Sequence, residues 1–170
     1  MKFGITVSQI NEVDLVVQAE NAGYDFCWVW DSPMIRSNLW ALLALVAERT
    51  SRISIGPGVA IPALSMAPVT ANAIATINAI APGRTFLGVG TGNTALRAMG
   101  QVPMTIQALE AQLKVIRGLL AGETVAYEAN GINEDIAFQS LELGCINLDD
   151  PIPIHISGFG PKAQALAGEY

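Results

Sequence analysis

Short apolar runs alternate along the chain with longer stretches in which apolar residues recur every three or four positions. The runs have the length of buried strands, and the recurring residues have the spacing of one helix face. Strands are predicted at Phe3–Val7, Phe26–Trp30, Ile53–Ile55, Thr85–Val89 and Ile152–Ser157. Helices are predicted from an N-cap at Asn11 to a stop at Gly23, around Leu39–Val46, over Pro68–Ile80 and Ile106–Leu120, and from Pro161 onward. Five strand–helix units in succession predict an α/β fold with a parallel sheet and right-handed crossovers.

One segment interrupts this alternation ahead of the fifth strand. Residues 124–148 are rich in Asn, Glu and Gly, and they follow Gly122, which ends the preceding helical pattern. We therefore expect a hairpin-like insertion at about 124–148.

Turns marked by glycine or proline follow four of the predicted strands. They are Asp31-Ser-Pro33, Gly56–Pro62, Gly88–Asn93 and Ser157–Pro161. The carboxyl ends of parallel strands meet on one rim of a sheet, where α/β proteins place their functional loops. The sequence therefore predicts one site assembled from these four loops.

The turn after the fifth strand has the features of an anion site. Gly158 and Gly160 let the backbone approach a ligand closely, and Pro161 suits the first position of a helix. Free backbone N–H groups and the positive end of the helix dipole then face the turn, with Lys162 nearby. The residues also fit G-x-G-x-x-[G/A], but a dinucleotide-binding fold carries that motif after its first strand. The alternative is a tight turn that binds nothing.

Composition restricts the classes of protein to consider. With 170 residues, 51% hydrophobic and 14% charged, the chain is one domain or a large piece of one, with a sizeable core. Its net charge of −6 argues against nucleic-acid binding. Prolines divide the uncharged stretch between Arg52 and Arg84, so no membrane span is expected.

Few side chains are candidates for direct chemistry. The two cysteines, Cys27 and Cys145, form neither a metal motif nor a disulfide framework, which suits a reducing cytoplasm. The single histidine, His155, either faces the site from the fifth strand or packs in the core. Asp31 ends a strand, where it could move a proton or cap the turn at Ser32. No nucleophile–base pair and no metal site is predicted, so a bound cofactor would have to supply the chemistry.

Several blocks of sequence resemble the luciferase-like flavin and deazaflavin oxidoreductases, above all the branch similar to methylenetetrahydromethanopterin reductase, which uses coenzyme F420. The blocks are Lys2–Ile5, Ala19–Asp25, Trp28–Ser32, Ile55–Val59, Pro82–Asn93, Ile156–Lys162 and Leu166–Tyr170. The resemblance implies a (β/α)8 TIM barrel with an insertion before strand five. Residues 1–170 would then form a single barrel domain that covers about the first five strand–helix units and is incomplete at its C-terminus.

The resemblance also implies positions for the cofactor. Ser157, Gly158, Phe159 and Gly160 would hold its phosphate beside Lys162, and Gly90, Thr91, Gly92 and Asn93 would line its ribityl chain and ring edge. A non-proline cis peptide would join Gly58 to Val59, in a bulge that backs the ring and holds it bent. Asp31 would lie beside the ring or the substrate, and Trp28 or Trp30, on one strand face, could stack on the cofactor.

We therefore expect hydride transfer between F420 and a small organic substrate. The alternatives are an FMN-dependent monooxygenase, a flavin-binding protein without turnover, and a fragment that neither binds nor catalyses. Because five strands leave the edges of the sheet unpaired, the chain would be a piece of a longer protein, a remodelled form, or a homodimer that closes the barrel; we expect the homodimer.

Overall fold

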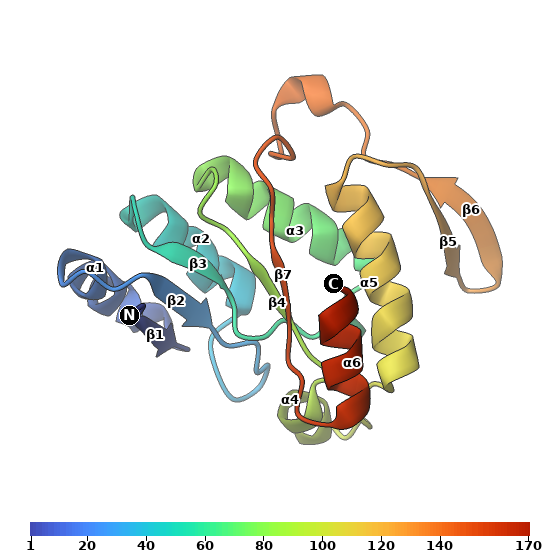
Figure 1. Ribbon diagram of the computed structural model, residues 1–170, viewed down its shortest axis with the longest axis horizontal. Coiled ribbons are helices and arrows are strands. Elements are labelled where there is room, and N and C mark those ends of the chain that lie inside the picture. The colour runs from blue at the N-terminus through green and yellow to red at the C-terminus, as the bar shows by residue number, and fades with distance from the viewer.

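The computed structural model describes residues 1–170 and contains five parallel strands at its centre. They are β1 (Gly4–Val7), β2 (Phe26–Val29), β3 (Ser54–Pro57), β4 (Leu87–Val89) and β7 (Ile154–Ile156). β1, β2 and β3 pair in that order, and β4 pairs with β7. Parallel bridges from Ile55 to Thr85 and from Ala60 to Val89 join the two groups (Figure 1). The predicted parallel α/β sheet is confirmed.

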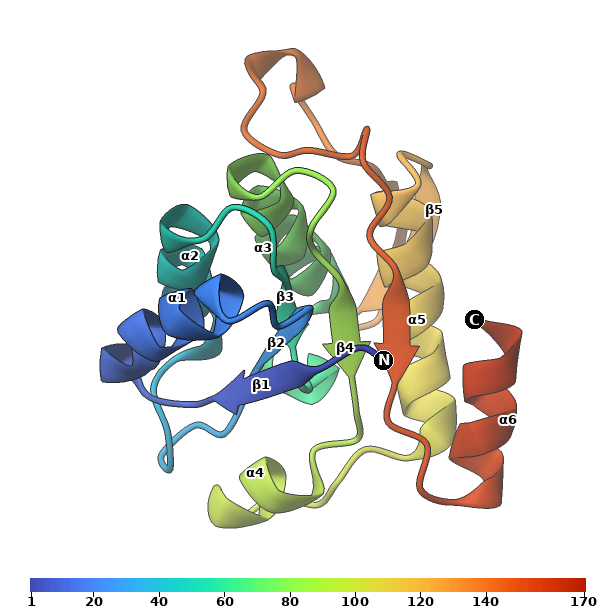
Figure 2. The same ribbon diagram turned by 60° about the vertical axis from the view of Figure 1, so that its left-hand side comes forward.

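The long helices pack side by side around the outside of this sheet. They follow the order α1 (Val13–Asn21), α2 (Leu39–Arg49), α3 (Ala67–Ile80), α5 (Ile106–Leu120) and α6 (Pro161–Glu169). Figures 1 and 2 show the helices as an outer layer, with the strands on the inner side. Their Leu, Ile and Val side chains form one principal core against the strands. This is the arrangement of part of a (β/α)8 barrel. None of the helices is both long and apolar enough to cross a bilayer.

The start of the first helix differs from the prediction. Asn11 is not an N-cap, because it lies inside a short 3-10 helix, η1 (Ile10–Glu12), that precedes α1. Glu12 is the N-cap residue of α1, and its carboxylate caps the start of η1 by accepting the N–H groups of Ser8 (2.6 Å) and Gln9 (2.8 Å). This capping box stabilises η1, and the chain passes from η1 directly into α1 at Val13.

A short helix, α4 (Asn93–Ala98), was not predicted. It begins directly after Gly92, whose φ of 75° is in the left-handed region that favours glycine. Ala95 and Leu96 pack with Ile61 in a small apolar cluster apart from the main core. This contact with the loop after β3 fixes the position of α4. That loop also includes a 3-10 helix, η2 (Pro62–Leu64).

The predicted insertion contains an antiparallel hairpin of β5 (Val125–Ala129) and β6 (Ile132–Ile136), followed by a 3-10 helix, η3 (Leu141–Leu143). The hairpin contacts α5 through β5 and lies away from the central sheet (Figure 1). Its return to β7 is held at Asn78 of α3, whose side-chain Nδ2 donates to the carbonyl groups of Asn147 and Asp150 at 3.0 Å each.

Two charged side chains, the buried Glu20 and the half-buried Arg84, hold the connection between α2 and β3. One carboxylate oxygen of Glu20 accepts the N–H groups of Ser51 (2.9 Å), Arg52 (2.6 Å) and Ile53 (2.9 Å). The Arg84 guanidinium donates to the carbonyl groups of Ala47, Thr50 and Ile53 within 3.1 Å. The backbone groups between α2 and β3 are therefore satisfied from both sides, which fixes β3 against β4.

Glu20 predicts a pH-dependent contribution to stability. Burial alone would raise the pKa of Glu20, but the three backbone N–H donors lower it below its ordinary value of 4.5. The ionised form therefore stabilises the fold above about pH 4.5, and this contribution is lost as the pH falls through the lowered pKa. We expect Glu20→Gln to lower the free energy of unfolding by about 1–3 kcal/mol at pH 7, measured by urea unfolding. The difference from wild type should shrink below pH 4.5.

Asp14→Asn is the matched control, because the Asp14 carboxylate forms an ion pair with Arg49 (2.9 Å) at an exposed site. Exposed ion pairs contribute little, so this change should alter the free energy of unfolding by less than about 1 kcal/mol. Equal effects of the two substitutions would contradict the role assigned to Glu20.

Candidate functional site

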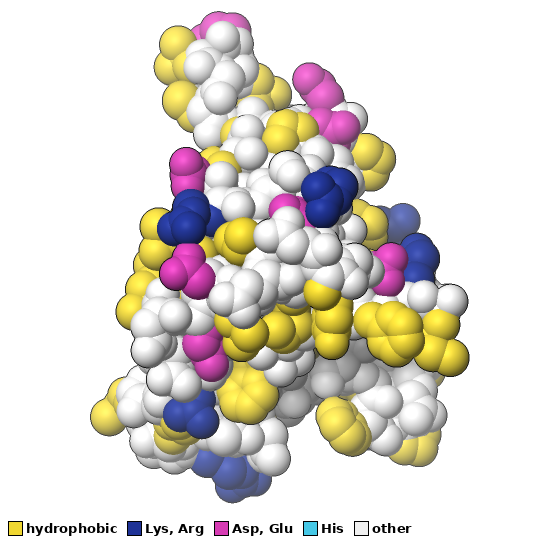
Figure 3. Space-filling view, turned by 90° about the vertical axis from the view of Figure 1, so that its left-hand side faces the viewer, with side chains coloured by type: hydrophobic (Ala, Val, Ile, Leu, Met, Phe, Trp, Pro, Cys, Tyr) yellow, Lys and Arg dark blue, Asp and Glu magenta, His cyan; other side chains and the backbone are white.

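A cavity of about 930 Å³ opens at the carboxyl ends of the strands. All four predicted loops line it, through residues 30–32, 58, 59, 61, 90–95, 157 and 159–163. Figure 3 shows a hollow in the lower half of the molecule with hydrophobic side chains along its edges. The volume is in the range of small-molecule sites, about 300–1,000 Å³. The loops thus meet on one rim, as the sequence pattern of parallel strands predicted.

Every site residue predicted from the sequence lines this cavity except Gly158. They are Asp31, Gly58, Val59, Gly90, Thr91, Gly92, Asn93, Ser157, Phe159, Gly160 and Lys162. Gly158 lies behind the turn, where a Cβ atom would be 3.4 Å from the Cα of Gln164. That the lining residues contact a cofactor stays a prediction.

The cavity depends on close backbone contact between the loops after β3 and β4. A Cβ atom on Gly90 would lie 2.7 Å from Cγ2 of Val59 and 3.4 Å from Cβ of Ser157. Only glycine leaves space there for the Val59 side chain. The peptide bond between Gly58 and Val59 is cis, as the family resemblance implied. Val59 therefore stands at the centre of the rim, between β4 and the loop after β7.

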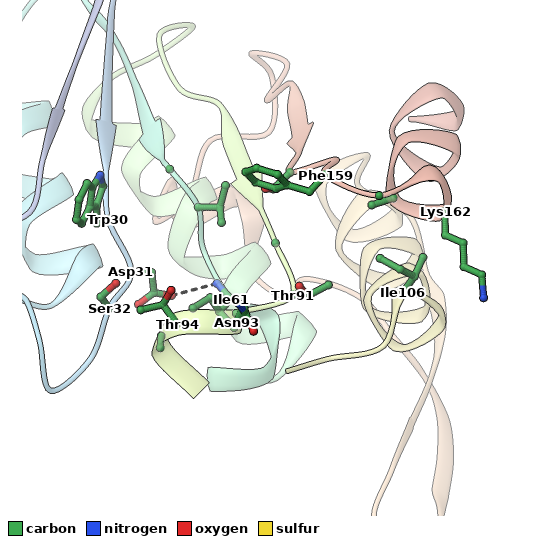
Figure 4. A pocket seen from close by; sticks show the side chains of 18 of the residues that line it. Trp30, Asp31, Ser32, Ile61, Thr91, Asn93, Thr94, Ile106, Phe159 and Lys162 are labelled. Atoms are coloured by element: carbon green, nitrogen blue, oxygen red, sulfur yellow. Dashed lines mark hydrogen bonds between the residues drawn. The ribbon is translucent and has the colours of Figure 1, made fainter. Parts of the chain in front are cut away.

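The turn after β7 presents unpaired backbone donors. The N–H groups of Gly158, Phe159, Gly160, Lys162 and Ala163 donate to no backbone acceptor, and the first bond of α6 runs from Gln164 to Gly160 (2.9 Å). These donors and the N-terminus of α6 suit an anionic group such as a phosphate. The Lys162 side chain extends away from the other lining side chains (Figure 4). Its backbone N–H therefore fits the anion site better than its ammonium group does.

Asp31 lies at the opposite side of the cavity from Lys162 (Figure 4). One carboxylate oxygen, Oδ2, accepts the N–H of Ile61 at 3.1 Å, and the other has no partner within the protein. Burial raises the pKa of Asp31, although the hydrogen bond from Ile61 partly opposes this shift. A carboxyl group with a raised pKa beside a cavity is suited to giving or taking a proton.

The aromatic candidates separate into two groups. Trp30 follows the end of β2 and lines the cavity, with the Arg36 guanidinium 5.8 Å from its ring centre. Trp28 does not line the cavity, because it stacks with Phe26 at 5.3 Å on the inner face of the sheet. His155 is outside the cavity as well: it is exposed and stacks on Phe86 at 4.8 Å. The structure therefore favours Trp30 over Trp28 as a stacking platform and does not bring His155 into the site.

Seven lining residues were not among the predicted site residues. Ser32, Ile61 and Pro161 lie within the predicted loops, whereas Thr94, Ala95, Ile106 and Ala163 lie outside them. Ile106 carries only the periodicity of a core helix, and α4 is too short to show a period of its own. The left-handed Gly92 before Asn93 was the one local indication of a helix start. No group of three or more His, Cys, Asp or Glu side chains lies close enough to hold a metal ion.

Comparison with known proteins identifies the class to which this fold and site belong. The family described as luciferase-like monooxygenase matches residues 7–170. The chain is 33% identical over 177 aligned positions to 5,10-methylenetetrahydromethanopterin reductase of Archaeoglobus fulgidus, covering 99% of this chain and 51% of that protein. The chain therefore belongs to the luciferase-like monooxygenase family, and it spans about half the length of this relative.

Solved structures agree with this assignment. The coenzyme F420-dependent tetrahydromethanopterin reductase from Methanopyrus kandleri superimposes with a TM-score of 0.78 at 25% identity, covering 99% of this chain and 53% of that one. A type II Baeyer–Villiger monooxygenase of Pseudomonas putida in complex with FMN superimposes with a TM-score of 0.75 at 20% identity, covering 99% and 55%. The predicted barrel-type fold and family are confirmed, and the described strands form part of the barrel.

The raised pKa of Asp31 predicts a second effect of pH on the stability of the fold, opposite in sign to the effect of Glu20. A carboxyl group whose pKa rises on folding binds its proton more tightly in the folded state, so stability falls as the pH rises from 3.8 through the raised value. Asp31→Asn keeps an acceptor for Ile61 and removes the buried charge. We expect this variant to be at least as stable as wild type at pH 7, with a smaller advantage at pH 4, in urea unfolding. A variant that is less stable at pH 7 would contradict burial as the dominant cause.

Proposed function

We propose that the protein to which this chain belongs transfers hydride between coenzyme F420 and a small organic substrate. The observation that carries this proposal is the set of free backbone N–H groups on the wall of the cavity, those of Phe159, Gly160, Lys162 and Ala163. The first N–H groups of a helix have no acceptor within it, and here they and the preceding turn lie where the family resemblance implies a cofactor phosphate.

The lining residues fit the parts of such a cofactor. The turn after β7 would hold the phosphate, and Gly90 to Asn93 would follow the ribityl chain and the edge of the ring. Val59, placed against Gly90, would support the face of the ring. Trp30, whose ring centre is 5.8 Å from the Arg36 guanidinium, offers an aromatic surface across the cavity.

The cofactor would supply two-electron hydride chemistry, and the chain's own residues would position it and handle the proton. Reduction of a carbonyl group needs a proton on oxygen as hydride reaches carbon, and oxidation of an alcohol needs its removal. We assign this proton to the free Oδ1 oxygen of Asp31. Ile61 holds the other carboxylate oxygen, and the raised pKa favours the protonated acid.

The relatives support F420 over FMN as the cofactor. The archaeal proteins are a methylenetetrahydromethanopterin reductase and an F420-dependent reductase, and a relative in Mycobacterium tuberculosis is an F420-dependent hydroxymycolic acid dehydrogenase. The FMN-bound monooxygenase is less similar in sequence. An FMN-dependent monooxygenase is therefore the second candidate.

Titration of the purified chain with F420 and with FMN, followed by fluorescence, tests this proposal. We expect F420 to bind more tightly, and we expect either cofactor to lose at least about tenfold in affinity when its phosphate is removed, because the turn after β7 then has no ligand. Preference for FMN would favour the monooxygenase. Binding of neither cofactor, or equal binding without the phosphate, would overturn the assignment of this turn.

The same titration on Gly90→Ala tests the fit at the rim. The added methyl group meets Val59 and Ser157, so it should displace the ring support and weaken F420 binding by about tenfold or more. Gly168→Ala, in α6, has no neighbouring atom within 4 Å and should bind like wild type. Unchanged binding by Gly90→Ala would remove Val59 from the proposed site.

The assembly and compartment are also proposals. Strands β1 and β7 have no partner on their outer edges, so a homodimer is the assembly we propose. Light scattering should then give twice the chain mass of 17.9 kDa, and a monomer would contradict it.

The compartment is proposed from the two cysteines. Cys27 is buried, which raises the pKa of its thiol to about 12, and Cys145 is exposed and unpaired. Unpaired cysteines suit the cytoplasm, where thiols stay reduced.

A further inference from the structure

A hydrogen bond beside the cavity fixes how one lining side chain presents its polar atoms. Asn93, the first residue of α4, lines the cavity on the side where Asp31 and Ile61 lie (Figure 4). One turn later, Arg97 donates from Nε to Oδ1 of Asn93 at 2.8 Å. Arg97 itself does not line the cavity.

The consequence follows from the shape of the amide group. Oδ1 and Nδ2 are the two separate branches of one planar group, so the bond that holds Oδ1 toward Arg97 leaves Nδ2 pointing away from the Arg97 guanidinium. Nδ2 donates no hydrogen bond within the protein. A guanidinium can only donate, so Arg97 cannot bind the amide in its reversed orientation.

We propose that Arg97 is a positioning residue: it fixes the Asn93 amide so that Nδ2 faces the cavity, and the site there selects a hydrogen-bond acceptor on the ligand. This proposal rests on the proposed function, because the acceptor would be an oxygen of the bound cofactor or substrate. Without Arg97 the amide can rotate, and its oxygen then meets the ligand oxygen and repels it. Arg97 therefore acts on the ligand through Asn93.

The alternative is direct attraction between the Arg97 charge and an anionic part of the ligand. A double-mutant cycle distinguishes the two, with F420 and FMN as probes. We expect Arg97→Met to weaken binding by about threefold to tenfold, the range of one hydrogen bond. In the Asn93→Ala background the same change should have no further effect. Equal effects of Arg97→Met in both backgrounds would overturn the proposal in favour of direct attraction.

Two further variants serve as controls for the double-mutant cycle. Asn93→Asp keeps the acceptor for Arg97 but replaces the N–H donor by an acceptor, so it should bind at least as weakly as Asn93→Ala. Arg49→Met removes one positive charge from an exposed ion pair with Asp14 at the end of α2, and it should bind like wild type. Asn93 and Arg97 are exposed, so these variants should keep the fold.

A measurement without ligand separates this proposal from the proposed function. In isotope-labelled protein, a through-hydrogen-bond coupling should link the Arg97 Nε–H to the Asn93 side-chain carbonyl carbon. Absence of this coupling in the free protein would overturn the positioning role, whatever binds. If the coupling is present but neither F420 nor FMN binds, the proposed function fails, and with it the acceptor selection by Nδ2.

Discussion

The cavity depends on how closely the backbones after β3 and β4 approach each other at the rim. Gly90 allows this approach, because a Cβ atom there would overlap the Val59 side chain. The approach brings the loop after β7 against the same point, through Ser157. It also lets the Ile61 N–H reach the Asp31 carboxylate from the loop after β2. A larger residue at position 90 would therefore disturb contacts among all four loops.

The two ends of the sheet use backbone polar groups in opposite ways. Between α2 and β3, Glu20 and Arg84 satisfy the free N–H and carbonyl groups of the connection. In the turn before α6 and in its first residues, the N–H groups of Gly158, Phe159, Gly160, Lys162 and Ala163 have no backbone acceptor. Satisfied groups stabilise the fold, whereas unsatisfied donors are available to a ligand. One end of the sheet thus satisfies its backbone groups within the chain, and the other leaves donors free beside the cavity; barrels of this type usually divide stability and function between their two ends in this way.

Different loops bring different polar groups to the two sides of the cavity. The β7 side offers fixed backbone donors, and the β2 side offers Asp31, whose carboxyl group is desolvated. Between them, Asn93 adds a donor whose direction is set by Arg97. A ligand with an anionic group at one end and oxygen acceptors along its length matches this order. The features lie within the half-length segment that the family relatives share with this chain.

Local sequence patterns determined the order of strands and helices, the hairpin within 124–148, and the glycine turn that leads into a helix at Pro161, because each depends on neighbours a few residues apart. The family resemblance supplied the cis bond at Gly58–Val59 and most of the lining residues. The tertiary structure decided the rest. It separated Trp30 from Trp28, moved His155 and Gly158 out of the cavity, replaced Asn11 by Glu12, and fixed α4 against Ile61. These outcomes depend on contacts between distant segments, and the local sequence pattern carries no information about which segments will meet.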